Sequence, residues 1–199
     1  MLRQRKYGMM EIKERIVNIK KKIETLKNSR SVGIKKATIV FKPFSKKQKK
    51  VLTWWNTNSP VKDKDGIIAD GAIRSGKTIS MSLSFAIWAM ETFNGQNFGM
   101  CGKTIGSFRR NVLFWLKLML KARKYHVQDK RADNLIVVSK GNVTNYFYIF
   151  GGKDERSQDL IQGITLAGVF FDEVVLMPQS FVNQATGRCS VDGSKFWLN

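Results

Sequence analysis

The apolar positions of the chain follow a helical rhythm near the N-terminus. Between residues 9 and 26 they recur at spacings of three and four, at Met9, Ile12, Ile16, Ile19, Ile23 and Leu26. Such a stripe predicts an amphipathic helix whose other faces are basic. The stripe is shorter than the three to four heptads that a coiled coil needs. The helix therefore either packs on its own domain, which we favour, or docks against a partner.

After a break at residues 28–36, short apolar runs alternate with longer segments of helical periodicity. The runs predict strands at residues 38–41, 66–69, 98–101, 134–139, 144–150 and 166–171. Helices are expected at residues 45–54, 77–93, 107–124 and 155–161 and again after Pro178, with Ser45 and Ser107 opening two of them. Residues 134–150 predict a hairpin around a turn at 140–142. Strands that alternate with helices predict an α/β fold with a mainly parallel central sheet flanked by helices.

Length and composition limit the class of protein. The chain has 199 residues, 43% of them hydrophobic, which suffices for the core of one large domain or a tight pair. No apolar run approaches about 18 residues and the N-terminus lacks the apolar region of a signal peptide, so we expect neither a membrane span nor secretion. Cys101 and Cys189 have no metal-ligand spacing and fit a reducing cytoplasm, while His126 is the only histidine, which excludes sites built on a histidine pair.

Charge divides the chain into two unequal parts. Residues 1–50 hold 17 basic and 3 acidic side chains, a net charge of +14, and residues 51–199 supply the remaining +6 of a total of +20. This imbalance indicates a polyanionic partner near the N-terminus. Nucleic acid is favoured over a membrane surface, and a solvated lysine-rich helix is the alternative. We expect a basic helical segment at residues 1–37 and a separate domain at residues 38–199.

Residues 71–78, GAIRSGKT, carry the strongest chemical signal. They match G-x-x-x-x-G-K-T between a strand pattern and a helix pattern, the context that a phosphate-binding P-loop requires. The glycines permit an unusual turn, and successive N–H groups at the start of the helix attract phosphate oxygens. Lys77 would bind the β- and γ-phosphates and the Thr78 hydroxyl would bind Mg²⁺. The expected nucleotide-binding residues of the loop are Gly71, Ser75, Gly76, Lys77 and Thr78.

An acidic pair follows the apolar run LAGVFF. Asp172 and Glu173 therefore stand at the C-terminal tip of a buried strand, where parallel sheets place their ligands. We expect Asp172 to hold Mg²⁺, through water, and Glu173 to polarise the attacking water of a hydrolysis. The separation of 95 residues between Lys77 and Asp172 leaves room for an intervening strand beside the strand of the P-loop. The pattern favours the P-loop NTPases that have an additional strand and a catalytic glutamate.

Two observations bear on the base of the nucleotide. The chain has no N-K-x-D motif, which disfavours GTP. Phe44 and Gln48 precede the P-loop and could contact an adenine. Ser45 and Gln48, however, also have the spacing of a capping box, which would make Gln48 purely structural. Both interpretations remain open at this point.

These motifs resemble the ATPase domain of a large terminase subunit, the DNA-packaging motor of tailed bacteriophages. The resemblance covers about residues 38–199. Its most specific parts are GAIRSGKT, residues 151–173 (GGKDERSQDLIQGITLAGVFFDE), and Arg188 with the strand at residues 195–198. The runs at residues 151–154 and 161–165 separate this family from helicases and kinases. Residues 99–110 are also similar to the family's second strand and the loop after it.

The resemblance implies Mg²⁺-dependent ATP hydrolysis coupled to translocation of double-stranded DNA into a procapsid. Family members act in the host cytoplasm as a homo-oligomeric ring on the portal, pair with a small terminase subunit and have no membrane partner. By position, Lys77 and Thr78 match the phosphate and metal ligands, and Gln48 matches the adenine motif. Asp172 matches the Mg²⁺ ligand and Glu173 the catalytic base.

The arginine that would stabilise the transition state is not fixed by position. Arg74 lies inside the P-loop and either contacts the γ-phosphate in cis, completing a catalytic set with Lys77 and Glu173, or points to solvent. Arg109 or Arg110 could act in trans across a ring. Such a group raises the rate by about 10³–10⁵ in related NTPases, so we expect an isolated monomer to be slow.

Family members usually continue into a coupling motif and an RNase H-like nuclease domain. The coupling motif would begin near Asn199, where the sequence ends, so we expect a truncated motor domain without DNA cleavage. Two alternatives to a packaging motor remain. One is another P-loop enzyme, such as a helicase-like ATPase or a kinase that would not need Glu173, and the other is a module that binds nucleotide or DNA without turnover.

Overall fold

The computed structural model describes residues 17–22, 24, 41, 43–72 and 75–199. The chain divides into two units, Met1–Pro43 and Phe44–Asn199. In the first unit, residues 17–22 and 24 are helical, as expected from the apolar stripe, and Phe41 has no regular structure. The rest of the predicted N-terminal helix and residues 38–40 of the first predicted strand lie outside the described residues. None of the described helices combines the length and apolar character needed to cross a bilayer.

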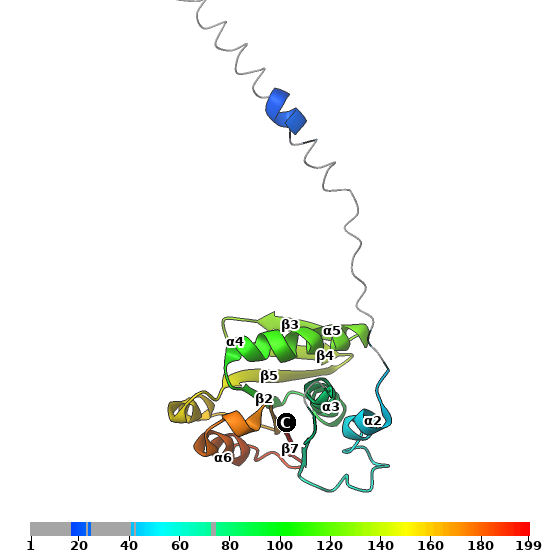
Figure 1. Cartoon of the computed structure of the whole chain (residues 1–199), viewed down its shortest axis with the longest axis vertical. Coiled ribbons are helices and arrows are strands. Elements are labelled where there is room, and N and C mark those ends of the chain that lie inside the picture. Colours follow the sequence, from blue (N-terminus) through cyan, green and yellow to red (C-terminus); the bar gives the residue numbers. More distant parts are fainter. Residues whose placement is uncertain (1–16, 23, 25–40, 42, 73–74) are drawn as a thin grey trace, which may run out of the picture. The chain divides into compact units, whose positions relative to one another are not determined.

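A seven-stranded sheet forms the centre of the second unit (Figure 1). Its order is β1-β7-β6-β2-β5-β4-β3. The pairs from β1 to β5 along this order are parallel, and β4 and β3 continue the sheet as antiparallel strands. The sheet is therefore mainly parallel, as predicted. The strands are β1 (Gly66–Ile68), β2 (Asn97–Gly102), β3 (His126–Lys130), β4 (Leu135–Lys140), β5 (Val143–Gly151), β6 (Gly168–Phe171) and β7 (Lys195–Leu198).

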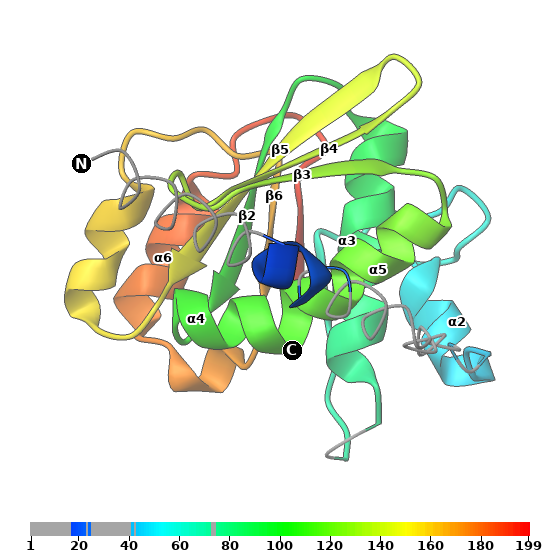
Figure 2. The ribbon, with the colours of Figure 1, turned by 90° about the horizontal axis from the view of Figure 1, so that it is seen from above.

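Helices cover both faces of the sheet (Figure 2). The α3 and α5 helices lie on one side, with α2 packed against α3, and η2 and α6 lie on the other. The helical elements are α2 (Lys46–Leu52), α3 (Lys77–Thr92), α4 (Ile105–Phe108), the π-helical turn η1 (Arg109–Leu113), α5 (Phe114–Ala122), the 3₁₀ helices η2 (Glu155–Ile161) and η3 (Val174–Leu176), and α6 (Gln179–Gly187).

Alternation along the central strands divides the buried residues into two cores. On β6, Phe170 joins the core under α3 and α5, whereas Val169 and Phe171 face the core under α6. Met100 and Cys101 of β2 separate in the same way. Because successive side chains of a strand point to opposite faces, a continuous apolar run is what a strand covered on both faces requires. This double burial holds the tips of the parallel strands in a fixed register.

Three sequence-based expectations need correction. Thr104, not Ser107, is the N-cap of the helix after β2, because its hydroxyl accepts the Ser107 N–H at 3.1 Å and the helix starts two residues earlier. The strand β3 was not predicted, since its exposed residues alternate with half-buried ones and give no apolar run. The strand that separates the P-loop strand β1 from β6 is β7, which follows β6 in the chain and does not come from the interval between Lys77 and Asp172.

Gly168, at the start of β6, is closely approached by α3 and β7. A Cβ at this position would lie 2.7 Å from Trp88 Cζ3 and 2.8 Å from the Lys195 carbonyl oxygen. Gly168→Ala should therefore lower the free energy of unfolding by about 1–3 kcal/mol in urea denaturation. The control is Gly187→Ala at the end of α6, where a Cβ meets nothing within 4 Å, and it should be neutral or slightly stabilising. Equal stabilities of the two variants would contradict this packing.

Candidate functional site

The P-loop turn connects β1 to α3 and ends in a left-handed glycine. Gly76 has φ +80° and directly precedes α3, and Gly71 opens the turn with φ +152°. The Lys77 ammonium folds over the turn and donates hydrogen bonds to the carbonyl oxygens of Gly71 and Ala72. Arg74 lies outside the described residues. The first-turn N–H groups of α3 and the Lys77 ammonium therefore both lie at the P-loop turn.

The acidic pair lies at the C-terminal tip of β6, as predicted. The Asp172 N–H donates to the Cys101 carbonyl oxygen at 2.9 Å and so extends the pairing of β6 with β2. Asp172 is buried, with 8% of its surface exposed. Glu173 is exposed and adopts a left-handed conformation with φ +58° and ψ +51°. A residue with a Cβ is disfavoured there, so the tip of β6 is a conformationally special position.

The structure brings the P-loop and the acidic pair together. The Thr78 hydroxyl donates to Asp172 Oδ1 at 2.9 Å. Asn199, directly after β7, donates from Nδ2 to the same Asp172 oxygen at 2.8 Å and contacts Thr78 Oγ1 at 2.9 Å. Three segments that are far apart in the sequence thus meet at one carboxylate.

The sequence motifs assigned no contact with the acidic pair to Asn199, although the family's coupling motif was expected to begin near it. A signal for this contact was present, because the resemblance included a strand at residues 195–198 and the C-terminal ends of parallel strands share one edge of the sheet. What the sequence did not reveal was the position of β7 between β1 and β6. That position places Asn199 beside Asp172.

Burial sets the electrostatics of Asp172. Loss of solvation raises the pKa of its carboxyl, the hydrogen bonds from Thr78 and Asn199 oppose this effect, and the nearby Glu173 charge raises the pKa further, so the pKa lies above its usual value. A cation bound beside Asp172 would favour the ionised form of this carboxyl. The hydroxyl and carboxylate oxygens are the hard ligands that Mg²⁺ prefers, and Mg²⁺ sites typically use few protein ligands and complete the shell with water and phosphate. In the described part of the chain, no group of three or more His, Cys, Asp or Glu side chains is placed to hold a metal.

A cavity of about 320 Å³, here called the P-loop cavity, opens at this junction. Besides the predicted residues, it is lined by Ile79 of α3 and by two residues from the helix after β2, Asn111 of η1 and Trp115 of α5. The sequence motifs pointed to none of these three. The full lining is Ser75, Gly76, Lys77, Thr78, Ile79, Asn111, Trp115, Asp172 and Glu173.

The capping box predicted from Ser45 and Gln48 is confirmed. The Gln48 Oε1 accepts the Ser45 N–H at 2.9 Å, and the Ser45 hydroxyl accepts the Gln48 N–H at 3.3 Å. Its Nε2 also donates to the Ser75 carbonyl oxygen at 3.0 Å, which ties α2 to the P-loop. Phe44 is half-buried against the core. The adenine contacts predicted for Phe44 and Gln48 stay a prediction.

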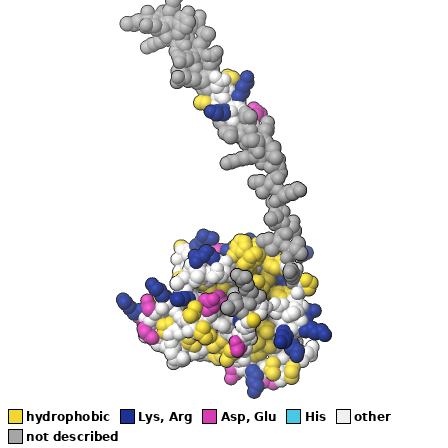
Figure 3. Space-filling view, in the orientation of Figure 1, with side chains coloured by type: hydrophobic (Ala, Val, Ile, Leu, Met, Phe, Trp, Pro, Cys, Tyr) yellow, Lys and Arg dark blue, Asp and Glu magenta, His cyan; other side chains and the backbone are white. Residues whose placement is uncertain are grey.

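Arg109 and Arg110 line a different depression, the basic hollow, of about 460 Å³. Arg109 and Lys117 each bond one carboxylate oxygen of Asp129 at 2.7 Å. Burial raises the pKa of Asp129, but the hydrogen bonds from Lys117 and Arg109 outweigh it and bring the pKa below its usual value. Figure 3 shows dark blue side chains at the α4 end of the sheet and over α2. The basic hollow is lined by Gly106, Arg109, Arg110, Phe114, Lys117, Asp129 and Arg131.

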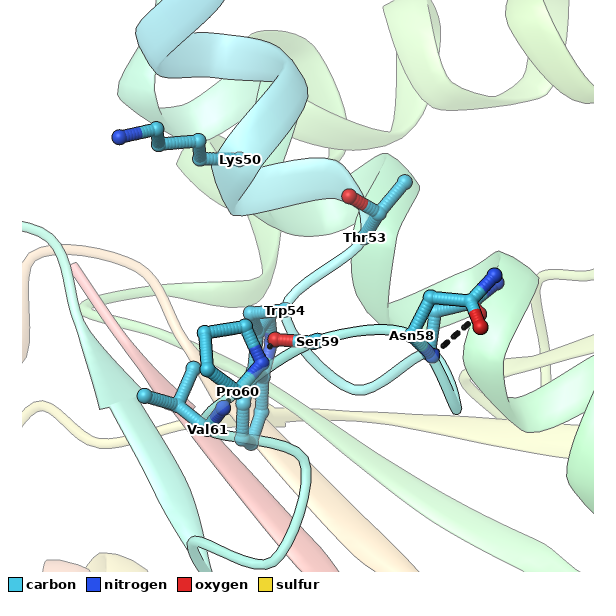
Figure 4. Close-up of a pocket in the computed structure, with 8 residues that line it drawn as sticks. Lys50, Thr53, Trp54, Asn58, Ser59, Pro60 and Val61 are labelled. Carbon is cyan, nitrogen blue, oxygen red and sulfur yellow. Dashed lines mark hydrogen bonds between the residues drawn. The ribbon is translucent and has the colours of Figure 1, made fainter.

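The most voluminous of these depressions, about 590 Å³, lies at the C-terminal end of α2 and shares no residue with the P-loop cavity (Figure 4). Trp54 forms its buried wall, with the Lys195 ammonium 5.2 Å from the indole and the Trp197 ring 5.0 Å away edge-on. Its other lining residues come from α2 and the loop after it, and they are mostly neutral and polar. This depression therefore lies apart from Asp172 and Glu173, which line the P-loop cavity.

The turn after β1, the acidic tip of β6 and the strand β7 between them define a P-loop NTPase fold with an additional strand. The chain also matches a family model described as terminase large subunit, T4likevirus-type, N-terminal, over residues 68–192. It belongs to this family of phage terminase large subunits, as the sequence motifs suggested. A search of the curated proteins gives no match.

Solved structures agree with this assignment. The large terminase of a thermophilic bacteriophage is 71% identical over 79% of this chain and 39% of its own, with a TM-score of 0.77. Further structures of that protein, in complex with ADP or ATP-γS, match at 68% and 67% identity, cover the same 79% of this chain and 38% of their own, and have TM-scores of 0.75 and 0.74. The ATPase domain of the Thermus phage P74-26 large terminase, 18% identical over 79% of this chain and 64% of its own, shares the fold with a TM-score of 0.54. The chain thus spans about two fifths of the first of these terminases.

The link between α2 and the P-loop can be measured at Gly76. A Cβ there would lie 2.6 Å from Gln48 Nε2, whereas a Cβ at Gly95, which has a similar φ of +74°, meets nothing within 4 Å. Both Gly→Ala changes carry the cost of a left-handed alanine, about 1–2 kcal/mol. Gly76→Ala should cost about 1 kcal/mol more in urea denaturation, because Gln48 must leave the Ser75 carbonyl.

A double-mutant cycle identifies the origin of that difference. In a Gln48→Ala background the two glycine replacements should cost the same, since the side chain that the new Cβ displaces is gone. A difference that persists in this background would mean that Gly76 is constrained by something other than Gln48.

Proposed function

We propose that residues 38–199 form the ATP-hydrolysing motor domain of a terminase large subunit, which couples Mg²⁺-dependent ATP hydrolysis to translocation of double-stranded DNA. The observation that carries this proposal is the contact between Thr78 and Asp172, at 2.9 Å, with Glu173 lining the same cavity. Hydrolysis of a triphosphate needs a phosphate cradle, a metal site and a base for water in one place. Family membership and the complexes of the 67–68% identical terminase with ADP and ATP-γS support ATP as the substrate.

The start of α3 would hold the phosphates. Its N–H groups and helix dipole favour negative charge, and Lys77 can exchange its two carbonyl hydrogen bonds for β- and γ-phosphate oxygens. Ser75 and Gly76 line the same cavity, beside Gln48. The adenine would then lie toward α2, where Phe44 and Gln48 stand.

Thr78 and Asp172 would hold Mg²⁺, Thr78 directly and Asp172 through water. The bound ion would neutralise charge on the β- and γ-phosphate oxygens. Asn199 fixes the Asp172 carboxylate by its hydrogen bond at 2.8 Å. A buried carboxylate that is already oriented needs no rearrangement when the cation arrives.

Glu173 would act as the base. It follows Asp172 directly, it is exposed to the cavity, and its left-handed backbone turns the chain away from the line of β6. Its carboxylate would accept a proton from water while the water oxygen attacks the γ-phosphorus and the bond to the β-phosphate oxygen breaks. A group of this kind contributes about 10²–10⁴ to the rate.

The charge on the transferred phosphate would be stabilised by an arginine, either Arg74 in cis or Arg109 or Arg110 of a neighbouring copy. Arg109 is bonded to Asp129 at 2.7 Å and is thus held at the surface of the basic hollow, away from the P-loop cavity of its own chain. This placement favours action across a ring over action in cis for Arg109.

The remaining partners follow from family membership. We propose double-stranded DNA as the translocated polymer, with a portal and procapsid, a small terminase subunit and a homo-oligomeric ring in the host cytoplasm. The net charge of +14 on residues 1–50 supports a polyanionic partner. The basic hollow adds four basic side chains around one carboxylate.

Glu173→Gln should bind Mg-ATP within about threefold of wild type but lower kcat by about 10²–10⁴, because only proton acceptance is lost. Nucleotide titration and phosphate release measure the two quantities. Asp192→Asn, a matched change at an exposed acid outside the cavity, should alter neither. Lys77→Ala should instead weaken binding itself. A Glu173→Gln variant with wild-type turnover, or one that loses nucleotide affinity, would contradict the role of Glu173.

Binding of the chain to double-stranded DNA should weaken steeply with salt. About five phosphate contacts predict a slope near −4.5 when log affinity is plotted against log salt concentration. Lys20, Lys21 and Lys22 all lie in the described basic helix, and changing the three to Gln should make the slope shallower by up to about 3. A flat salt response of the wild-type chain would remove the electrostatic basis for the polyanionic partner.

A further inference from the structure

We infer that Asn111 binds the γ-phosphate of the nucleotide and so distinguishes ATP from ADP. This inference rests on the proposed ATPase function and adds a specificity-determining residue to it. It starts from the P-loop cavity, in which Asn111 is the one neutral polar side chain that comes from the helix after β2.

A π-helical turn presents Asn111 to the cavity. The turn η1 interrupts the helical segment between α4 and α5, and Asn111 is its central residue. Turns of this kind weaken the backbone ladder, are rare, and occur frequently at functional sites. Val112 and Leu113, the next two residues, are 1% exposed each and anchor the turn in the core. The position of Asn111 is therefore fixed by packing although its side chain is exposed.

The carboxamide of Asn111 is available to a ligand. No described residue forms a hydrogen bond with it, whereas Thr78, Asp172 and Asn199 bond one another. Asn is also a poorer helix former than Ala, so the exposed side chain brings the helix no stability of its own. A solvated surface asparagine would have these properties too, but this one lines the same cavity as the metal and base candidates.

The place of Asn111 in the cavity points to the end of the triphosphate. The α2 helix meets the P-loop at Ser75 through Gln48, so the base end of the nucleotide lies on that side. Asn199 approaches Asp172 from β7. Since β2 lies on the other side of β6 from β7, the helix that follows β2 reaches the cavity from the flank opposite Asn199. A triphosphate bound in the cavity would place its terminal phosphate between Asn199 and the helix after β2, next to Glu173.

Trp115 completes this flank. It stands four residues after Asn111, so both side chains lie on one face of the helical segment, and both line the cavity. Its ring is half-buried and meets Phe114 edge-on, with centroids 5.0 Å apart. Asn111 and Trp115 together form the flank of the cavity that the helix after β2 supplies.

Calorimetric titration of the full chain with ATP-γS and with ADP, each with Mg²⁺, tests this assignment. Asn111→Ala should weaken ATP-γS binding about tenfold and leave ADP binding within about twofold, because ADP has no γ-phosphate for the carboxamide to contact. Asn111→Asp should weaken ATP-γS binding further, since it places an anion beside the phosphate. Asn183→Ala, a matched change at an exposed helical asparagine of α6 outside the cavity, should leave both affinities unchanged.

Thermal unfolding without nucleotide separates binding from stability, and Asn111→Ala should melt at or above the wild-type temperature. Equal weakening of both nucleotides, or no change in either, would overturn the role of Asn111 while wild-type binding and hydrolysis leave the proposed function standing. A wild-type chain that binds neither nucleotide would overturn the proposed function and this inference with it.

Discussion

A single buried carboxylate, Asp172, connects the parts of this molecule. It stands at the tip of β6 and accepts hydrogen bonds from Thr78 of α3 and from Asn199 after β7. Burying a carboxylate is costly unless donors or a cation compensate it, and here burial outweighs the two donors, so its pKa is raised. A cation at this junction would favour the ionised carboxylate. The proposed sites for the phosphates, for Mg²⁺ and for the attacking water all lie beside it.

The rest of the fold holds this junction in place. The apolar side chains of β2 and β6 alternate between two cores, one under α3 and α5 and one under α6. Both faces of these strands are thus fixed by packing. If a strand moved by one residue along its neighbours, the side chains of one core would face the other core. The tips of β1, β7 and β6 consequently meet at one edge of the sheet, where the polar groups can approach each other without a rearrangement of the backbone. Asp172 and Glu173 directly follow the buried strand β6, and the start of α3 carries Thr78 and the phosphate cradle.

Local signals made much of this predictable from the sequence. The glycines of the P-loop, the acidic pair after a continuous apolar run, and the Ser45–Gln48 capping box are encoded within a few residues, and all three were found where expected. The order of the strands in the sheet could not be predicted from such local patterns. The insertion of β7 beside β1, and with it the role of Asn199, depends on how the sheet assembles. Thr104 and Ser107 both have side chains that can cap a helix, and the structure uses Thr104. Asn111 entered the site through a π-helical turn, for which the pattern of apolar residues gave no sign.

Diffraction from crystals of the chain grown with ATP-γS and Mn²⁺, recorded at the manganese absorption edge, tests the convergence of the P-loop and the β6 tip most directly. We expect one manganese peak about 2 Å from Thr78 Oγ1, with Asp172 bound to it directly or through one water and the triphosphate along the start of α3. A triphosphate on the P-loop with the metal bound away from both Thr78 and Asp172 would contradict this account.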